Sequence, residues 1–211
     1  RRSHSTYTYI IDTPRLCDDL PSRVQLKPLM ATNPEIKKFV KEHKDAFLED
    51  LFSLIRIPSV SSQASHKEDM VRCAERWSEI LKSIGMDRAE ILPTGGHPAV
   101  FAEKKYSEEA PTVIVYGHYD VMPAEPLDEW NQPDPFEPVI KDGLIVARGS
   151  DDCKGQSSTQ VQGLRTALEL GLVKCNVKVL LEGEEEIGSI NMESFLKKHK
   201  DLLACDIILV S

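Results

Sequence analysis

Short apolar runs separated by turn residues are the feature that most constrains the fold of this chain. They occur at residues 99–102, 112–116, 144–147, 177–181 and 206–210. Runs of this length, bounded by glycine, proline or polar residues, are typical of buried β-strands. We therefore predict four or five strands between residues 99 and 210.

Helical patterns come before these runs. Asn33 followed by Pro34 predicts a capped helix start, and apolar residues then recur at helical spacing up to Pro58. Residues 65–68 match a capping box at the start of a second helix, and Gly85 is suited to its end. The apolar stripe of this second helix consists of Met70, Cys73, Trp77, Ile80, Leu81 and Ile84.

Further helices are predicted between the strands, at residues 156–170 and 192–198. Strands that alternate with helices predict an α/β fold, here a helix-sheet-helix sandwich with a mostly parallel sheet. The proline-rich stretch 123–138 predicts a long loop, and long loops in compact domains are often functional. Residues 1–29 follow neither period, so we treat them as an N-terminal extension of unknown status before a domain that begins at residue 30.

The composition excludes several classes of protein. Aspartate and glutamate outnumber lysine and arginine by 34 to 26, which argues against nucleic acid as a partner. The apolar runs are far shorter than the ~20 residues of a membrane-spanning helix. The first residues of the sequence do not show the pattern of a secretory signal. The five cysteines form no C-x-x-C pair and indicate neither a disulfide framework nor a zinc knuckle. A cytoplasmic protein is therefore the simplest prediction.

The first cluster of polar residues follows the run 112–116 and contains His118 and Asp120. In an extended chain these two side chains lie on the same side, and a carboxylate beside an imidazole commonly orients it for metal binding. An isolated pair of this kind more often serves only to hydrogen-bond a loop, because polar groups also serve structure.

Two further clusters carry carboxylates between glycines. Residues 148–155 contain Asp151 and Asp152. An acidic cap at the start of a helix would explain one of these two aspartates. Residues 182–188 contain three consecutive glutamates, a pattern that usually marks a solvated face. Here the glutamates stand between an apolar run and a glycine turn, where a bound cation would offset their repulsion.

Together the three clusters hold one histidine and several carboxylates, which suits a pair of divalent metals. We expect them to follow neighbouring strands, and ligands in α/β sheets gather beyond the carboxyl ends of strands. Signatures of serine hydrolases, HExxH zinc proteases and nucleotide-binding loops are missing from the sequence. Cys153 paired with His118 is an alternative nucleophile, but no sequence feature places a thiolate-stabilising group beside it, which favours an inert thiol.

Six motifs along residues 33–211 carry a resemblance to a known family. They are Ile57-Pro58-Ser59-Val60-Ser61, residues 117–123, Trp130 with Pro135-Phe136, Asp142-Gly143-Leu144, residues 148–155 and residues 182–188. In this order they resemble the motifs of the zinc aminoacylase/carnosinase-like dipeptidase family of dinuclear metallohydrolases. The resemblance implies an α/β catalytic domain that holds two Zn²⁺ ions, with Mn²⁺ as the alternative.

The resemblance also implies roles for five residues. His118 would be a ligand of one metal, with Asp120 as the catalytic carboxylate that orients it. Asp152 would bridge both metals, Glu185 would be the general base, and Glu186 would be a ligand of the second metal.

Three details accompany this assignment. The family often has Asp-Asp-Lys-Gly where this chain has Asp152-Cys153-Lys154-Gly155, so the second aspartate is replaced. The resemblance implies a cis peptide bond between Asp152 and Cys153. Glu184 is expected to face solvent.

The implied reaction is hydrolysis of a dipeptide or related amide by a water shared between two metals, with Glu185 as the base. Further ligands and a smaller domain that closes over the substrate and forms a homodimer would lie beyond Ser211. We therefore expect residues 30–211 to be the amino-terminal part of the catalytic domain, inactive alone. An N-acyl amino acid deacylase, a carboxypeptidase, and a truncated non-catalytic form acting through partners remain as alternatives.

Overall fold

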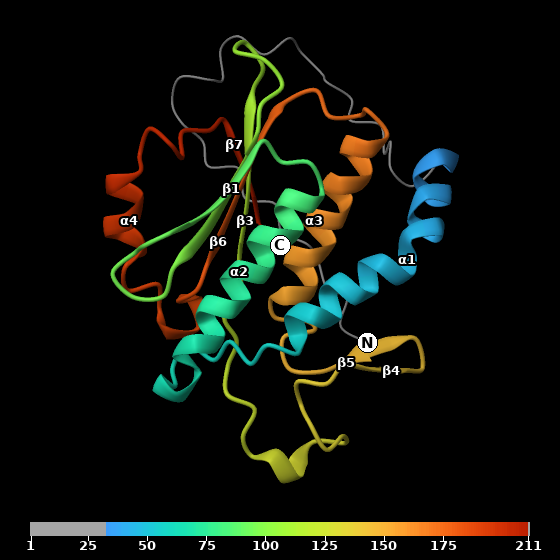
Figure 1. The fold of residues 1–211 in the computed structure, drawn as a ribbon, viewed down its shortest axis with the longest axis vertical. Coiled ribbons are helices and arrows are strands. Elements are labelled where there is room, and N and C mark those ends of the chain that lie inside the picture. Colours follow the sequence, from blue (N-terminus) through green and yellow to red (C-terminus); the bar gives the residue numbers. More distant parts are fainter. Residues whose placement is uncertain (1–32, 211) are drawn as a thin grey trace, which may run out of the picture.

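A computed structural model describes residues 33–210 and shows a five-stranded sheet between layers of helices (Figure 1). The strand order is β1-β2-β6-β3-β7. The strands are β1 (Arg88–Leu92), β2 (Ala99–Lys104), β3 (Thr112–His118), β6 (Asn176–Glu182) and β7 (Ile207–Val210). β2 is antiparallel to both β1 and β6, whereas β3 is parallel to both β6 and β7. Four strands therefore share one direction, which confirms the mostly parallel sheet.

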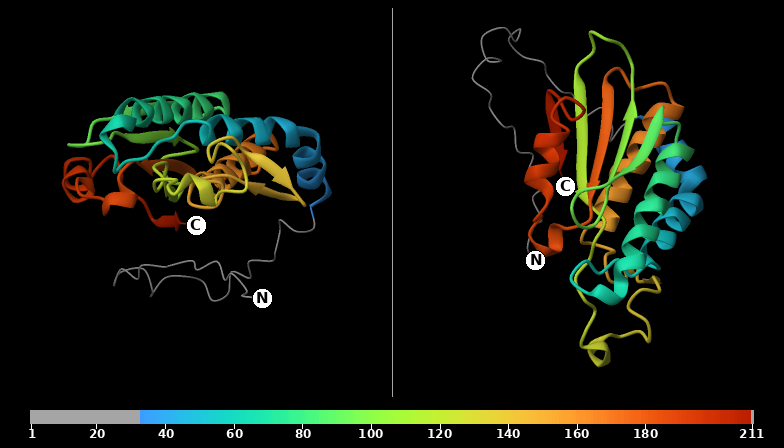
Figure 2. Two further views of the ribbon diagram at one scale, coloured as in Figure 1. Left: turned by 90° about the horizontal axis from the view of Figure 1, so that it is seen from below. Right: turned by 60° about the vertical axis from the view of Figure 1, so that its left-hand side comes forward.

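The helices cover both faces of this sheet, which confirms the predicted sandwich. The three longer helices, α1 (Pro34–Ile55), α2 (Lys67–Ser83) and α3 (Lys154–Glu169), lie on one face, and α4 (Met192–Lys198) lies on the other (Figure 2). α3 begins and ends within two residues of the predicted 156–170, and α4 matches its prediction at both ends. The predicted extension, residues 1–29, lies outside the described residues.

The two predicted helix caps have different outcomes. Asn33 caps α1 as predicted, because its side-chain oxygen accepts the N–H groups of Glu35 at 2.9 Å and Ile36 at 3.4 Å. The capping box at residues 65–68 is wrong. A 3₁₀ turn, η1 (Ala64–His66), precedes α2 instead, and neither start has a side-chain cap.

The run at 144–147 is a strand, as predicted, but it does not join the central sheet. It forms β5 (Leu144–Val146), which pairs with β4 (Val139–Lys141) in a separate two-stranded sheet. Asp142 and Gly143 both have positive φ, at 53° and 80°, as the tight turn of a two-residue hairpin requires. The loop predicted at 123–138 is confirmed, with one short 3₁₀ turn, η2 (Leu127–Glu129), inside it.

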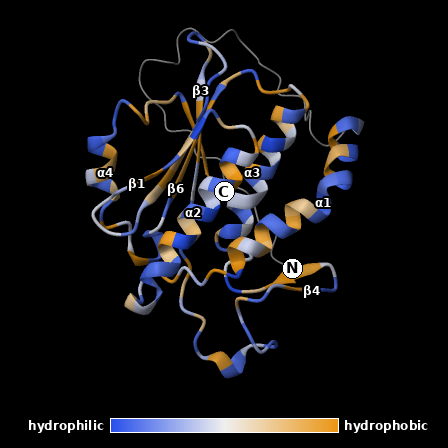
Figure 3. Ribbon diagram, viewed as in Figure 1, coloured by the Kyte–Doolittle hydropathy of each residue, from blue (hydrophilic) through white to orange (hydrophobic). Residues whose placement is uncertain are grey.

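The core forms where α2 packs on the sheet. All six residues of the predicted apolar stripe are buried, and they belong to one cluster with Val100, Val115, Val179 and Leu181 of the central strands. Figure 3 shows the resulting pattern, with apolar strands inside and polar residues along the outer faces of the helices. No helix within residues 33–210 is long and apolar enough to cross a membrane.

The stability of this core is testable at Trp77, which has no exposed surface. Replacing Trp77 with alanine is expected to lower the free energy of unfolding by about 3 to 5 kcal/mol, because a large cavity remains. Val71, on the same helix, is 42% exposed, and Val71→Ala is the matched control. Urea denaturation measures both, and equal losses would contradict the assignment of this stripe as the core.

Candidate metal centre

Three segments meet at the carboxyl end of the central sheet. β3 ends at His118 and β6 ends at Glu182, and these two residues are paired in register. The third segment carries Asp152 and reaches the site at the start of α3. The strand that precedes Asp152 is β5, and β5 is not part of the central sheet. The expectation that all three clusters follow strands of one sheet is therefore wrong.

His118 lies at the centre of the cluster, with its two ring nitrogens in different surroundings. Nδ1 is 3.3 Å from a carboxylate oxygen of Asp120 and 3.1 Å from the backbone oxygen of the same residue. Nε2 is 3.1 Å from an oxygen of Asp152 and 3.8 Å from an oxygen of Glu185. A hydrogen bond from Nδ1 to Asp120 leaves Nε2 available toward the other carboxylates, as a metal-ligating histidine requires.

Asp120 also holds the loop that carries the two glutamates. It is fully buried, and its carboxylate accepts the backbone N–H of Glu185 at 3.2 Å and that of Glu186 at 3.0 Å. One side chain therefore orients the imidazole and fixes the backbone from which both glutamates project. The predicted proximity of His118 and Asp120 is present, and this second contact was not predicted.

The donor atoms near His118 fit a divalent metal. The potential ligand atoms of His118, Glu185 and Glu186 all lie within 4.8 Å of one another, and so do those of His118, Asp152 and Cys153. Imidazole nitrogen and carboxylate oxygen are ligands that Zn²⁺ and Mn²⁺ accept. Burial and the neighbouring carboxylate of Asp152 raise the pKa of Glu186, a repulsion that a cation would relieve.

The electrostatics around His118 involve Cys153 as well. Burial favours the neutral imidazole, but the side chains of Asp120 and Cys153 outweigh it and raise the pKa of His118 to about 11. The Cys153 thiol is buried beside the ring, and although burial opposes it, His118 and Ser157 lower the pKa of the thiol, so the expectation that no thiolate-stabilising group lies beside Cys153 is wrong. The peptide bond between Asp152 and Cys153 is cis, as the resemblance implied.

Glu184 does not face solvent, contrary to expectation. It is 5% exposed, and its carboxylate accepts hydrogen bonds from the backbone of His97 and from the side chain and backbone of Asn191. A Cβ atom at Gly96 would overlap this carboxylate. The pair Gly95-Gly96 is the sequence signal that could have indicated a side chain packed closely against this loop, because glycine leaves room for such a contact.

Lys154 is a second residue whose structural role was missed. Its side chain is fully buried, and Nζ donates to the backbone oxygens of Leu54 at 2.8 Å and Ile57 at 2.7 Å. Burial lowers the pKa of this ammonium group. Because these carbonyls lie at the end of α1, Lys154 ties the start of α3 to that end.

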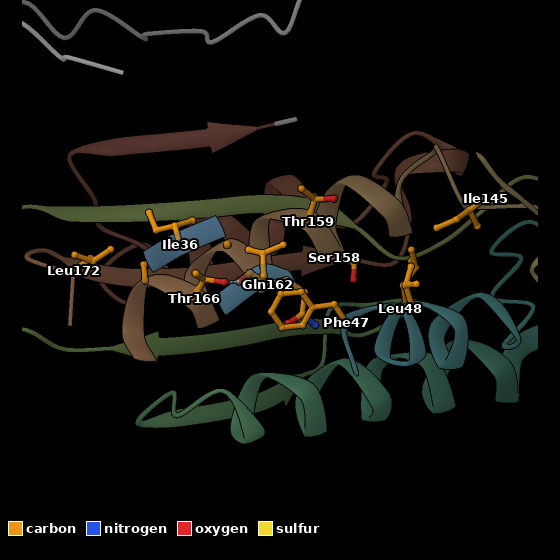
Figure 4. A pocket seen from close by; sticks show the side chains of 13 residues that line it. Ile36, Phe47, Leu48, Ile145, Ser158, Thr159, Gln162, Thr166 and Leu172 are labelled. Atoms are coloured by element: carbon orange, nitrogen blue, oxygen red, sulfur yellow. Dashed lines mark hydrogen bonds between the residues drawn. The ribbon is translucent and has the colours of Figure 1, made fainter. Parts of the chain in front are cut away.

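A hollow in the described part of the chain lies away from these residues. A cavity of about 540 Å³ opens between α1 and α3 (Figure 4). Its lining is apolar or carries hydroxyl and amide groups: Ile36, Val40, Phe47, Leu48, Leu51, Ile145, Ser158, Thr159, Gln162, Gly163, Thr166, Ala167 and Leu172. No residue in this lining titrates or ligates metals, so the chemistry assigns the site to the strand ends.

Comparison with known proteins shows a similarity to peptidases. Residues 114–210 match the peptidase family M20/M25/M40. The chain is 30% identical over 190 residues to the Beta-Ala-His dipeptidase of Rattus norvegicus, covering 82% of this chain and 38% of that protein.

Two solved structures are similar in fold and sequence. The crystal structure of human carnosine dipeptidase 1 has a TM-score of 0.76 and 27% identity, covering 84% of this chain and 40% of that one. An M20 family metallo-carboxypeptidase from Sulfolobus solfataricus has a TM-score of 0.73 and 33% identity, covering 78% and 36%. The chain thus spans less than half the length of each of these relatives.

Proposed function

Because residues 114–210 match the peptidase family M20/M25/M40, we propose that this chain is part of a metal-dependent hydrolase that cleaves a dipeptide or a related small amide. The observation that carries the proposal is the placement of His118, whose Nε2 lies between the carboxylates of Asp152 and Glu185. A buried imidazole oriented by Asp120 and surrounded by acidic oxygens is suited to a divalent metal and to proton transfer.

Each residue has a distinct role in this proposal. His118, Asp152 and Glu186 would hold two Zn²⁺ ions, or Mn²⁺ in their place, with Asp152 shared between them. Bound divalent metal supplies a Lewis acid that polarises the scissile carbonyl and lowers the pKa of water. Asp120 keeps His118 oriented.

Glu185 is the proposed general base. Its side chain is half exposed and faces Nε2 of His118 at 3.8 Å, so a water molecule can reach it beside the ligands. The carboxylate would accept a proton from the attacking water and return it to the nitrogen of the leaving amine. The proton thus moves from water to product, and Glu185 ends unchanged.

A carboxypeptidase is the second candidate. It is favoured by the 33% identity to the Sulfolobus solfataricus metallo-carboxypeptidase, which exceeds the 27% identity to the human dipeptidase structure. An N-acyl amino acid deacylase would use the same residues. Dimerisation and a cytoplasmic location stay predictions from the sequence.

Metal removal tests the proposed function. The protein at its natural length, supplied with Zn²⁺ or Mn²⁺, is expected to hydrolyse β-Ala-His or Cys-Gly, to lose turnover on treatment with a chelator, and to regain it when metal is returned. Release of free amino acid, measured by chromatography, reports the reaction. Parallel assays with a longer peptide and an N-acetyl amino acid separate the carboxypeptidase and the deacylase. Turnover that persists without metal would overturn the proposal.

A further inference from the structure

Glu184 is the most thoroughly hydrogen-bonded carboxylate in the loop after β6. Its side chain accepts the backbone N–H of His97 at 3.0 Å, the Asn191 side-chain amide at 3.0 Å and the Asn191 backbone N–H at 3.3 Å. A carboxylate with several N–H donors forms charge-assisted bonds, which are stronger than neutral ones. The mechanism proposed above gives this buried group no part.

The backbone of Glu184 starts the turn that carries the proposed base and ligand. Its carbonyl oxygen accepts the N–H of Ile187 at 3.2 Å and that of Ser189 at 2.7 Å. These bonds close the 3₁₀ turn η3 (Glu185–Ile187). The side chain and the backbone of Glu184 together thus fix the position at which this turn begins.

One donor to Glu184, His97, belongs to a segment that leads back to the histidine. His97 lies in the loop between β1 and β2, and its Nε2 is 3.0 Å from the backbone oxygen of Ser61. Two residues earlier, the Ser59 hydroxyl donates to the backbone oxygen of Tyr119 at 2.7 Å, and the Ser59 carbonyl accepts the N–H of Val121. A chain of hydrogen bonds and short backbone segments thus connects Glu184 to both neighbours of Asp120.

We propose that Glu184 is a positioning residue, which clamps the loop of Glu185 and Glu186 against the β1–β2 loop. Asp120 holds the same loop from the β3 side through the two glutamate N–H groups. Two buried carboxylates therefore fix the turn from opposite sides and set the separation between Glu185 and His118. The inference rests on the proposed function for its catalytic consequence, but the clamp itself is a property of the described residues.

Substituting glutamine for Glu184 tests this role. Glu184→Gln keeps the size of the side chain but places an amide donor among N–H donors, so at least one hydrogen bond is lost. In the metal-loaded protein at natural length, we expect kcat and metal affinity to fall about 10- to 100-fold, as for other groups that orient ligands. KM is expected to change less, because Glu184 is buried away from solvent.

Glu193→Gln is the matched control. Glu193 is 81% exposed on α4 and pairs only with Lys197 at the surface, so the same chemical change is expected to leave kcat and metal affinity unaltered. Hydrogen exchange of the peptide containing Glu185 and Glu186 is measured in parallel and is expected to accelerate in Glu184→Gln alone.

The outcomes separate the clamp from general stability and from the proposed function. A variant that melts earlier but keeps kcat, metal affinity and exchange rates at a temperature where it is folded would overturn the clamp. If Glu184→Gln does not fold, Asn191→Ala removes donors from the same carboxylate and is expected to give a smaller change in the same direction. If the unaltered protein hydrolyses none of the substrates, the proposed function fails, whereas metal affinity and hydrogen exchange still decide on Glu184.

Discussion

Replacing Glu185 with glutamine is expected to lower kcat by about 10²- to 10⁴-fold, the usual contribution of a general base. Glutamine cannot accept a proton from water at neutral pH, so the proton-transfer step loses its acceptor. The backbone N–H of residue 185 still reaches Asp120, because that hydrogen bond does not involve the side chain. The loop should therefore keep its position, and the metal content of the protein should stay near normal.

The neighbouring glutamate provides the matched comparison. Glu186→Gln removes one negative charge from the same turn, but in our assignment it removes a metal ligand. We expect this variant to lose metal, which atomic emission of the dialysed proteins measures alongside kcat. If Glu185→Gln loses the metal and Glu186→Gln retains it, the roles of the two residues have been exchanged.

Local signals in the sequence predicted most of the fold correctly. The cap at Asn33, the apolar stripe of α2 and the strand runs depend on residues close together in the chain, so they can be read without knowing the topology. The capping box at Ser65 failed because a 3₁₀ turn competes for the same backbone groups. The run at 144–147 has the composition of a strand, but the composition does not tell which sheet a strand joins.

The candidate site was predictable where it lies at strand ends. His118 and the glutamates follow the two apolar runs that become β3 and β6, and these strands are neighbours in the sheet. That pairing is not visible in the sequence, but the carboxyl ends of parallel strands meet at one edge. Asp152 reaches the same place by a different route, through the start of α3.

The buried charged residues were missed because their partners are distant in sequence. The N–H of His97 that Glu184 accepts belongs to a residue 87 positions away, and Lys154 donates to a carbonyl 100 positions away. A run of three glutamates looks solvated when only its neighbours are considered. In the folded chain, tertiary contacts bury Glu184, whereas Glu185 and Glu186 lie close to His118.

Replacing Asp120 with alanine is expected to damage stability and metal binding together. The N–H groups of Glu185 and Glu186 would lose their acceptor, at about 1 to 3 kcal/mol each when no water replaces it. We therefore expect the free energy of unfolding to fall by roughly 2 to 6 kcal/mol. Metal affinity should also fall about 10- to 100-fold, because His118 then loses the carboxylate beside Nδ1 and only the backbone oxygen of residue 120 remains near that nitrogen.

Asp120→Asn separates these two effects, because the amide keeps one oxygen for the loop while losing the charge that faces the imidazole. Its stability is expected to lie between those of the parent and the alanine variant, whereas its metal affinity should fall nearly as far. Asp151→Ala is the control, since Asp151 is exposed and precedes the proposed bridging residue. Urea denaturation and metal titration measure the two quantities. A loss of metal in Asp151→Ala, with Asp120→Asn unaffected, would move the ligand assignment from Asp152 to Asp151 and leave Asp120 as a purely structural acceptor.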